Sequence, residues 1–433
     1  MYRVTETSRI PLTERTPEEL RTFHDEQRAA YAQLQSAGLA LDLTRGKPST
    51  AQLDLADALL RLPEGVRDAD GVDVRNYGGL TGLRELREMF AELLWVSPEQ
   101  LVAGGTSSLT MMHDCLVDLL LHGGVDSERP WGQEEKVTFI CPVPGYDRHY
   151  TMLAHHGIDM VTVPMLSDGP DIAAVEALVK ADPSIKGMWL VPTYANPAGA
   201  VVTQEVAARL AAMPTAAPDF KLFWDNAYAL HHLTEDEAKS SDIISLASAA
   251  GNPHRPLMFA STSKITYAGS GVAFLAASVE NIAWYLGHLQ FASIGPDKVN
   301  HLRHIQFFGS AQGVRDHMAK HRAILAPKFA AVQDALAPLA GLGVATWTKP
   351  TGGYFVSVDV LPGIASRVVA LAKEAGIALT PAGASFPYGK DPDDTNIRLA
   401  PSFPVLAEVE TAMAGVATCI ALAAVEQLLA TTA

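Results

Sequence analysis

Short apolar runs alternate with amphipathic stretches through the middle of the chain. The runs suit buried strands because they are short, rich in branched and aromatic residues, and apolar on both faces. They are KVTFICPVP, DMVTVPM, IKGMWLVPTY, FKLFWDNAY, PLMFAST and GVAFLAAS, all between residues 136 and 278. Stretches with helical spacing, such as 171–181 and 203–213, lie between several of them. This alternation predicts an α/β fold, with a large three-layer domain over residues 50–305 in which helices cover a mostly parallel sheet.

The two ends of the chain are predicted to form a second domain, a smaller and discontinuous α/β unit made of residues 1–49 and 306–433. A helix is predicted to begin directly after Thr16, because a proline stands at its first position. Residues 310–339 have a long helical pattern, which we expect Pro327 to interrupt. Shorter strand patterns follow this helix.

The length and charge of the chain narrow the possible classes of protein. A chain of 433 residues is long for one core, which agrees with two domains. Apolar residues make up 48% and charged residues 19%, as in folded globular proteins. The formal net charge of −15 argues against nucleic acid and anionic membranes as partners. An anionic ligand would therefore have to be held by local basic residues.

The cysteines and the chain termini predict a cytoplasmic protein. Cys115, Cys141 and Cys419 lack the spacing of metal ligands, so we expect reduced core residues and no metal site. The polar N-terminal segment predicts that there is no signal peptide. The apolar stretch 411–425 is shorter than the roughly 20 residues that a membrane span needs, so we expect a buried C-terminal helix.

Unusual polar residues follow four of the predicted strands. Tyr146 and Asn196 follow two of them, Asp225 and Tyr228 stand in DNAY after a third, and Lys264 stands in STSK after PLMFA. We expect these side chains to converge, because α/β proteins bind ligands at the carboxyl ends of parallel strands. Taken singly, each is more often a helix cap, a turn residue or a surface side chain than a site residue. Together at one edge they predict a site.

A turn rich in glycine and hydroxyl groups, GGTSS, opens a predicted helix near these strand ends. A helix N-terminus with small residues offers free N–H groups to a phosphate. An enzyme that depends on pyridoxal 5′-phosphate needs a particular set of groups at its site. They are an amine, a carboxylate, hydrogen-bond donors, an aromatic ring and an anion-binding cup.

Eight segments resemble, in order, the motifs of the fold-type I pyridoxal phosphate aminotransferases of the aspartate aminotransferase superfamily. They are NYGGLTGLRELR, GGTSS, PGYDRHY, YANPAGA, DNAY, STSK, KPTGGYF and NIRLAPSF. The resemblance covers nearly the whole chain, and NPAG stands where Asn-Pro-Thr-Gly is usual. It implies the fold-type I architecture and pyridoxal 5′-phosphate as the cofactor.

The resemblance implies a role for each candidate residue. Lys264 would form the Schiff base with the cofactor, Asp225 would hold the pyridine nitrogen, and Tyr146 would stack on the ring. Asn196 and Tyr228 would bind the phenolic oxygen, and Asn196 would also border the substrate. The candidates for the phosphate are Gly105, Thr106, Ser107, Ser108, Ser261 and Ser263.

Three more residues take roles from the resemblance. Arg398 resembles the arginine that binds the substrate α-carboxylate, for which a planar guanidinium is well suited. Gly46 would let the backbone approach the substrate. Tyr77 resembles a tyrosine that reaches the phosphate of the other subunit, which implies a homodimer with shared active sites.

One position departs from the family pattern. Most members carry an arginine eight residues after the Schiff-base lysine, and this chain has Val272 there. The phosphate would then depend on hydroxyls, backbone amides and the helix dipole. With Val272 at this position, the chain resembles a bacterial branch of aspartate aminotransferases. That branch is also similar to the aminotransferase-like domains of MocR-type regulators. The segment before the large domain is too short for the winged-helix domain of such a regulator, which favours a stand-alone enzyme.

The implied reaction is ping-pong transamination between L-aspartate and 2-oxoglutarate. A dicarboxylic substrate needs a second cation, and each candidate is equally a solvated basic residue. These candidates are Arg45, Lys47, Lys298, Arg303 and His304. Aminotransferases for aromatic, branched-chain or 2-aminoadipate donors, and a β-lyase of the same fold, would keep the same residues. A non-catalytic sensor domain that binds the cofactor, or a nucleotide- or sugar-binding α/β protein, are the alternatives outside enzyme chemistry.

Overall fold

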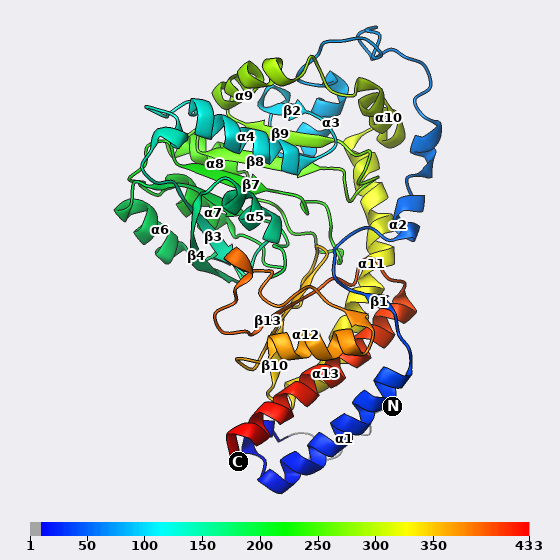
Figure 1. Ribbon diagram of the computed structural model, residues 1–433. Helices are drawn as coiled ribbons and strands as arrows, with labels where there is room; N and C mark the ends of the chain where they lie inside the picture. The colour runs from blue at the N-terminus through cyan, green and yellow to red at the C-terminus, as the bar shows by residue number, and fades with distance from the viewer. Residues whose placement is uncertain (1–9, 433) are drawn as a thin grey trace.

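The computed structural model describes residues 10–432, which form two α/β parts joined along one long helix (Figure 1). The larger part contains an eight-stranded sheet with the order β2-β9-β8-β7-β6-β3-β4-β5. Its strands are β2 (Leu101–Ala103), β3 (Thr138–Val143), β4 (Asp159–Leu166), β5 (Gly169–Pro170), β6 (Ile185–Leu190), β7 (Lys221–Asp225), β8 (Pro256–Ser261) and β9 (Ala273–Ala277). Pairing is parallel from β8 to β4 and antiparallel at β2, β9 and β5. The sheet is therefore mostly parallel.

Helices cover both faces of this sheet. One face packs against α3 (Arg84–Leu94), α6 (Ile172–Ala181), α7 (Gln204–Ala212), α8 (Ile243–Ala249) and α10 (Lys298–Phe308). The other face packs against α4 (Ser108–His122), α5 (Asp147–His155) and α9 (Val279–Ala292). The expected three-layer α/β fold is confirmed.

The strand sequences explain why both faces are buried. Along β7, Leu222 and Trp224 point into one helix layer and Phe223 points into the other, and all three are fully buried. Successive side chains of a strand point to opposite faces, so a strand between two helix layers must be apolar at every position. The continuous apolar runs of the sequence follow from this requirement.

The smaller part joins the two ends of the chain in one hydrophobic core. Its strands form a three-stranded antiparallel sheet, β10-β11-β13, and a separate pair, β1-β12. The elements are α1 (Pro17–Ser36), β1 (Leu41–Asp42), β10 (Ala345–Trp347), β11 (Val356–Val360), α12 (Ala365–Glu374), β12 (Ile377–Ala378), β13 (Asn396–Leu399) and α13 (Leu406–Thr432). The short helix α2 (Thr50–Asp54) lies against α11. In Figure 1, α1 and α13 lie side by side at the lower end of the molecule.

The long helix α11 (Ala311–Ala340) runs from the larger part into the smaller one (Figure 1). Pro327 lies inside it, so the prediction that this residue interrupts the helix is wrong. Leu325 and Phe329 are buried on either side of Pro327, and such packing outweighs a cost of about 3 kcal/mol for an internal proline. The first turns of α11 pack against the core of the larger part. The proposed domain limit at residue 305 stays a prediction.

The C-terminal helix α13 is a core helix. Over Leu406–Thr431 it is long and apolar enough to cross a membrane by length and composition, and 61% of its most apolar window is buried inside the protein. Val409, Met413 and Val416 are fully buried. The predicted buried C-terminal helix is confirmed.

Candidate active site

Four neighbouring parallel strands bring different side chains to one edge of the large sheet. β7 ends at Asp225, and Lys264 comes three residues after β8. β3 leads through a short turn to Tyr146, the residue before α5, and β6 leads to Asn196. Nζ of Lys264 lies 4.8 Å from the centre of the Tyr228 ring. The structure thus brings together the residues that the strand-end pattern singled out.

Asp225 uses one oxygen to bind a histidine and leaves the other free. Its Oδ2 lies 3.1 Å from Nε2 of His149. The His149 ring is stacked on Trp189, with ring centres 4.3 Å apart. Oδ1 of Asp225 is buried and has no hydrogen-bond partner among residues 10–432. Because buried acceptors are normally paired, this oxygen is suited to a donor that the described chain does not supply.

The same edge holds further buried polar groups. Asn196 Oδ1 and Thr193 Oγ1, in the loop after β6, have no partner within the described range 10–432. Burial raises the pKa of Tyr146 to about 12, an effect that the Lys264 charge partly offsets. Burial also raises the pKa of Tyr228. Both phenols are therefore protonated hydrogen-bond donors at neutral pH.

The N-terminus of α4 forms one side of a small cup. Ser107 is the N-cap, and its side chain accepts the Thr110 N–H at 3.4 Å. Ser108 is the first residue of the helix. A Cβ added at Gly105 would meet no heavy atom within 4 Å, so the space beside this residue is open. Free N–H groups and the helix dipole favour an anion here.

The loop before Lys264 forms the other side of this cup. The Ser263 hydroxyl donates to the Thr106 carbonyl oxygen at 3.4 Å. The Ser263 N–H donates to Oγ of Ser261, also at 3.4 Å. All the residues predicted to hold a phosphate therefore lie on two loops in mutual contact.

Val272 lies in the core and not in the cup. It is fully buried, its N–H donates to Oγ1 of Thr262 at 2.8 Å, and its carbonyl accepts the Thr262 N–H at 2.8 Å. Thr262 Oγ1 in turn contacts Nε2 of the buried His304 at 3.3 Å. Within residues 10–432, no arginine hydrogen-bonds to a residue of the cup.

Arg398 approaches the site from the smaller part, on β13. It is 7% exposed. Its Nη1 donates to Oδ1 of Asp147 at 2.9 Å, and its Nε donates to Oγ1 of Thr380 at 3.4 Å. Its Cζ lies 5.2 Å from the centre of the Phe355 ring. Gly46 packs against the same ring, because a Cβ at this position would overlap Cζ of Phe355.

A buried polar network lies behind the Lys264 backbone. The Tyr354 hydroxyl lies 3.3 Å and His231 Nε2 3.4 Å from the Lys264 carbonyl oxygen. Gln52 donates to the Tyr354 hydroxyl at 2.8 Å and lies 3.0 Å from Nδ1 of His321. Burial lowers the pKa of His321 to about 3 and also lowers that of His231, so both rings are neutral.

Tyr77 lies apart from the other site residues. Its side chain is 82% exposed, and its carbonyl oxygen accepts a hydrogen bond from Nζ of Lys298 at 3.3 Å. The segment between α2 and α3 that carries Tyr77 runs along the outer edge and the top of the molecule in Figure 1. Apart from this contact with Lys298, Tyr77 makes no hydrogen bond to the other candidate residues within residues 10–432.

The five basic candidates for a distal carboxylate differ in their surroundings. Arg303 Nε donates to the Leu62 carbonyl oxygen at 2.7 Å, and His304 is buried against hydroxyl groups. Arg45 and Lys47 are exposed, with the Lys47 ammonium 3.7 Å from the centre of the Phe403 ring. Lys298 is buried beside the exposed Tyr77 loop.

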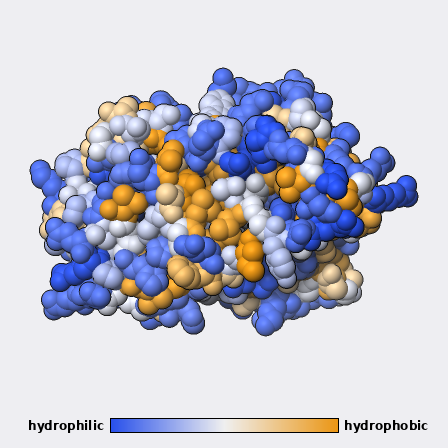
Figure 2. Space-filling model, turned by 90° about the horizontal axis from the view of Figure 1, so that it is seen from above, coloured by the Kyte–Doolittle hydropathy of each residue, from blue (hydrophilic) through white to orange (hydrophobic). Residues whose placement is uncertain are grey.

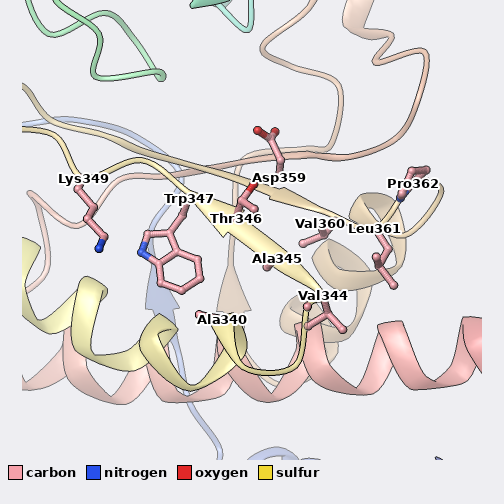
Figure 3. Close-up of a pocket in the computed structure, with 11 residues that line it drawn as sticks. Ala340, Val344, Ala345, Thr346, Trp347, Lys349, Asp359, Val360, Leu361 and Pro362 are labelled. Carbon is pink, nitrogen blue, oxygen red and sulfur yellow. The ribbon is translucent and has the colours of Figure 1, made fainter. Parts of the chain in front are cut away.

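A groove of about 480 Å³ lies elsewhere, between β10, β11 and the end of α11 (Figure 3). The Trp347 ring lies over α11 there, and its Nε1 donates to Gln333 at 2.8 Å. Asp359 points to the opposite side of the strands, where Asn396 donates to it at 2.8 Å. None of the strand-end residues lines this groove, so it is not the candidate active site.

Comparison with known proteins identifies the family. A family model described as aspartate aminotransferase matches residues 15–432. The chain is 54% identical to an aspartate aminotransferase of Corynebacterium glutamicum, over 98% of this chain and 99% of that relative. The chain belongs to the aspartate aminotransferase family. It is an enzyme, a transaminase.

Solved structures of aminotransferases agree with the fold. An aspartate transaminase from Corynebacterium glutamicum superposes with a TM-score of 0.95 at 54% identity, over 97% of this chain and 100% of that chain. An α-aminoadipate aminotransferase of Thermus thermophilus, solved with N-(5′-phosphopyridoxyl)-L-leucine, has a TM-score of 0.72 at 23% identity, over 90% and 93% of the two chains. This second likeness supports the fold-type I architecture.

Three side chains at the site of this aminotransferase were not predicted from the sequence. His149 and Asp147 stand in the quoted segment PGYDRHY, and Tyr354 stands in KPTGGYF. His149 lies three residues after Tyr146, and this spacing puts both residues on one side of a helical turn. The spacing could therefore have predicted that His149 lies at the site. Nothing in the sequence alone indicates that Asp147 faces Arg398, because the two residues are 251 positions apart.

Proposed function

We propose that this aminotransferase moves the amino group of L-aspartate to 2-oxoglutarate in a ping-pong order, with pyridoxal 5′-phosphate bound at Lys264. One observation carries the proposal: the Lys264 amine, the unpartnered Asp225 oxygen and the N-terminus of α4 converge at one sheet edge. The substrate pair is supported by the relative that is 54% identical and is named an aspartate aminotransferase.

The site residues fit this cofactor. When bound, pyridoxal phosphate supplies an aldehyde that condenses with amines and a ring that draws electrons from the substrate carbon. Asp225 Oδ1 would accept the N–H of the ring, and its negative charge would keep that nitrogen protonated. Tyr146 would stack on the ring, while Asn196 and Tyr228 would hold its phenolic oxygen.

Lys264 would also move the proton at the substrate Cα, because its amine would be released next to that carbon once the substrate takes its place on the cofactor. The contacts of Tyr354 and His231 with the Lys264 carbonyl fix the backbone that carries this amine. Both contacts come from buried side chains, whereas Lys264 itself is partly exposed and so stays accessible to a substrate.

Neutral groups would hold the phosphate. The proposed ligands are the hydroxyls and N–H groups of the cup, which is made of Gly105, Thr106, Ser107, Ser108, Ser261 and Ser263. Val272 is buried in the core, and no arginine hydrogen-bonds to the cup within residues 10–432, so the dipole of α4 would supply much of the favourable field.

Arg398 would bind the substrate α-carboxylate. It is buried and rests on Phe355, and the bare backbone of Gly46 lies against the same ring. Two parallel N–H groups of a guanidinium match a carboxylate, which orients the substrate for attack at one face.

We also propose a homodimer in which Tyr77 reaches the phosphate of the partner subunit. Figure 2 shows apolar side chains gathered across the middle of the face that is uppermost in Figure 1. The segments at this end carry Phe291, Ile294 and Tyr77, which are 87%, 63% and 82% exposed. Exposed apolar patches of this kind mark interfaces between proteins. Lys298 beside Tyr77 is then the proposed cation for the distal carboxylate in the shared site.

The first experiment tests the cofactor. Purified protein is expected to be yellow, and borohydride should fix the cofactor on a peptide that contains Lys264. Lys264→Ala should lose both the trapped cofactor and turnover, whereas Lys349→Ala, at an exposed lysine, should keep them. A wild-type protein that stays colourless with added cofactor would falsify the proposal.

The second experiment tests the substrate. Amino donors are screened with 2-oxoglutarate by the glutamate that forms, and aspartate is expected to exceed alanine and phenylalanine. A better aromatic, branched-chain or 2-aminoadipate donor would replace aspartate in the proposal. Release of ammonia and pyruvate from a donor that carries a thiolate leaving group on its β carbon would indicate a β-lyase, and bound cofactor without turnover would indicate a sensor domain. Cytoplasmic location is proposed from the three free, buried cysteines.

A further inference from the structure

The guanidinium proposed to bind the substrate already holds a carboxylate of the same chain. Nη1 of Arg398 and Oδ1 of Asp147 are 2.9 Å apart, the length of a charge-assisted hydrogen bond. The Arg398 side chain is 7% exposed and the Asp147 side chain 34% exposed. The pair is thus buried on the arginine side and open to solvent on the aspartate side.

The two charges come from opposite parts of the molecule. Arg398 lies on β13 of the smaller part, whereas Asp147 is the first residue of α5, directly after Tyr146 on the larger part. His149, on the first turn of the same helix, holds Asp225. Asp147 therefore follows directly on the residue proposed to stack on the ring, and its carboxylate contacts the residue proposed to bind the substrate carboxylate.

The donors of Arg398 show what a substrate would meet. Nη1 is bonded to Asp147 and Nε to Thr380, and Nη2 has no partner within the described residues. A carboxylate that binds two adjacent N–H groups of a guanidinium needs Nη2 together with Nη1 or Nε. In both cases its negative charge comes close to that of Asp147, and like charges in a partly desolvated site repel.

We propose that Asp147 is an internal competitor for the α-carboxylate of the substrate, held on Arg398 until a substrate displaces it. This inference rests on the proposed role of Arg398. A carboxylate tethered within reach of the guanidinium has a high effective concentration, so it raises the dissociation constant of every ligand that binds there. Asp147 also keeps the buried guanidinium paired while no substrate is present, which avoids an uncompensated buried charge.

The test measures binding of maleate, an unreactive dicarboxylate, to the holoenzyme. Asp147→Asn keeps the size of the side chain and removes its charge, and Asp147→Ser keeps a residue that suits a helix start. Both variants are expected to lower the dissociation constant of maleate by roughly three- to tenfold. The KM for the amino donor should fall by a similar factor, while kcat stays within about twofold, as expected for uniform binding.

Matched variants separate the possible causes. Asp334→Asn removes the same charge from an exposed position on α11 and should leave maleate binding unchanged. If neither Asp147 variant tightens the binding of maleate, or if both weaken it, the proposed competition is wrong and Asp147 only orients Arg398. Arg398→Gln should weaken maleate binding more than tenfold. If that variant binds maleate as the wild type does, the proposed role of Arg398 fails and the inference on Asp147 falls with it.

Discussion

At the scale of single residues, the two oxygens of the Asp225 carboxylate have different roles, and this difference explains how the site is oriented. Oδ2 is held by His149, which is itself fixed by stacking on Trp189. Oδ1 is buried without a partner among residues 10–432. A carboxylate that is anchored at one oxygen and free at the other is oriented before any ligand arrives, which reduces the reorganisation needed during the reaction.

The first prediction concerns this free oxygen. Asp225→Asn keeps the shape of the side chain but loses the charge that would hold a proton on the ring nitrogen. We expect kcat to fall by roughly a hundredfold or more at saturating cofactor. His149→Asn leaves the charge in place, and its kcat should fall by less than about tenfold. Steady-state kinetics distinguish the two, and full turnover in Asp225→Asn would contradict the assignment.

The second prediction concerns Gly46. A methyl group at this position would overlap the Phe355 ring, on which Arg398 rests. We expect Gly46→Ala to lower the free energy of unfolding by about 1–3 kcal/mol and to raise the KM for the amino donor. Denaturant titration and kinetics measure both effects. A second change, Phe355→Leu, makes room for the methyl group and should recover part of the stability, whereas no recovery would show that the overlap is not the cause.

At the scale of elements, the apolar runs were sufficient to predict six strands. Burial on both faces makes β3 and β6 to β9 largely apolar, whereas β4 was predicted although only Val163 is buried in it. Strand β2 (Leu101–Ala103) was missed, since three residues are too few to show any periodicity. The prediction that Pro327 interrupts α11 failed because the helix propensity of proline does not include the buried packing on both sides of this residue.

For the site too, residues near strand ends were predictable from the local sequence, whereas contacts between distant segments were not. Tyr146, Asn196, Asp225 and Lys264 each follow a strand, so chain order and sheet topology were enough to group them. The Arg398–Asp147 pair and the network of Gln52, Tyr354 and His321 join distant segments. Such contacts depend on how the smaller part packs on the larger one, which no local pattern encodes.

The third prediction belongs to the buried histidines of α10 and α11. Burial lowers the pKa of His321 to about 3 and that of His301 to about 4, below the ordinary value of 6.5. Between these values the unfolded chain binds protons that the folded chain does not, so stability is full above about pH 6.5 and falls as the pH decreases. Each histidine adds up to about 1.4 kcal/mol per pH unit to this loss.

Urea unfolding at several pH values checks this prediction. His321→Gln should reduce the dependence of the unfolding free energy on pH between pH 6 and 4 by about one proton. An unchanged pH dependence in this variant would show that His321 does not contribute to acid unfolding.

At the scale of the whole molecule, the exposed apolar face of Figure 2 gives the fourth prediction. Phe291→Asp places a charge where the proposed homodimer buries an aromatic ring, so the protein should become monomeric. Turnover should fall with it, because Tyr77 would no longer reach a second site. Light scattering and kinetics over a range of concentrations test this. Leu166→Asp, at an exposed position on β4 and far from β2 in the strand order, is the control that should stay dimeric.

The core position of Val272 has a consequence for how the protein takes up its cofactor. Within residues 10–432 no arginine hydrogen-bonds to the cup, whose hydroxyl and N–H groups are neutral donors, while the chain as a whole carries a formal charge of −15. At long range the protein therefore repels the ligand that it must capture. Added salt screens that repulsion, and it weakens no guanidinium contact in the cup. Reconstitution of the cofactor-free enzyme should become faster as ionic strength rises, the reverse of what an arginine beside the phosphate would produce.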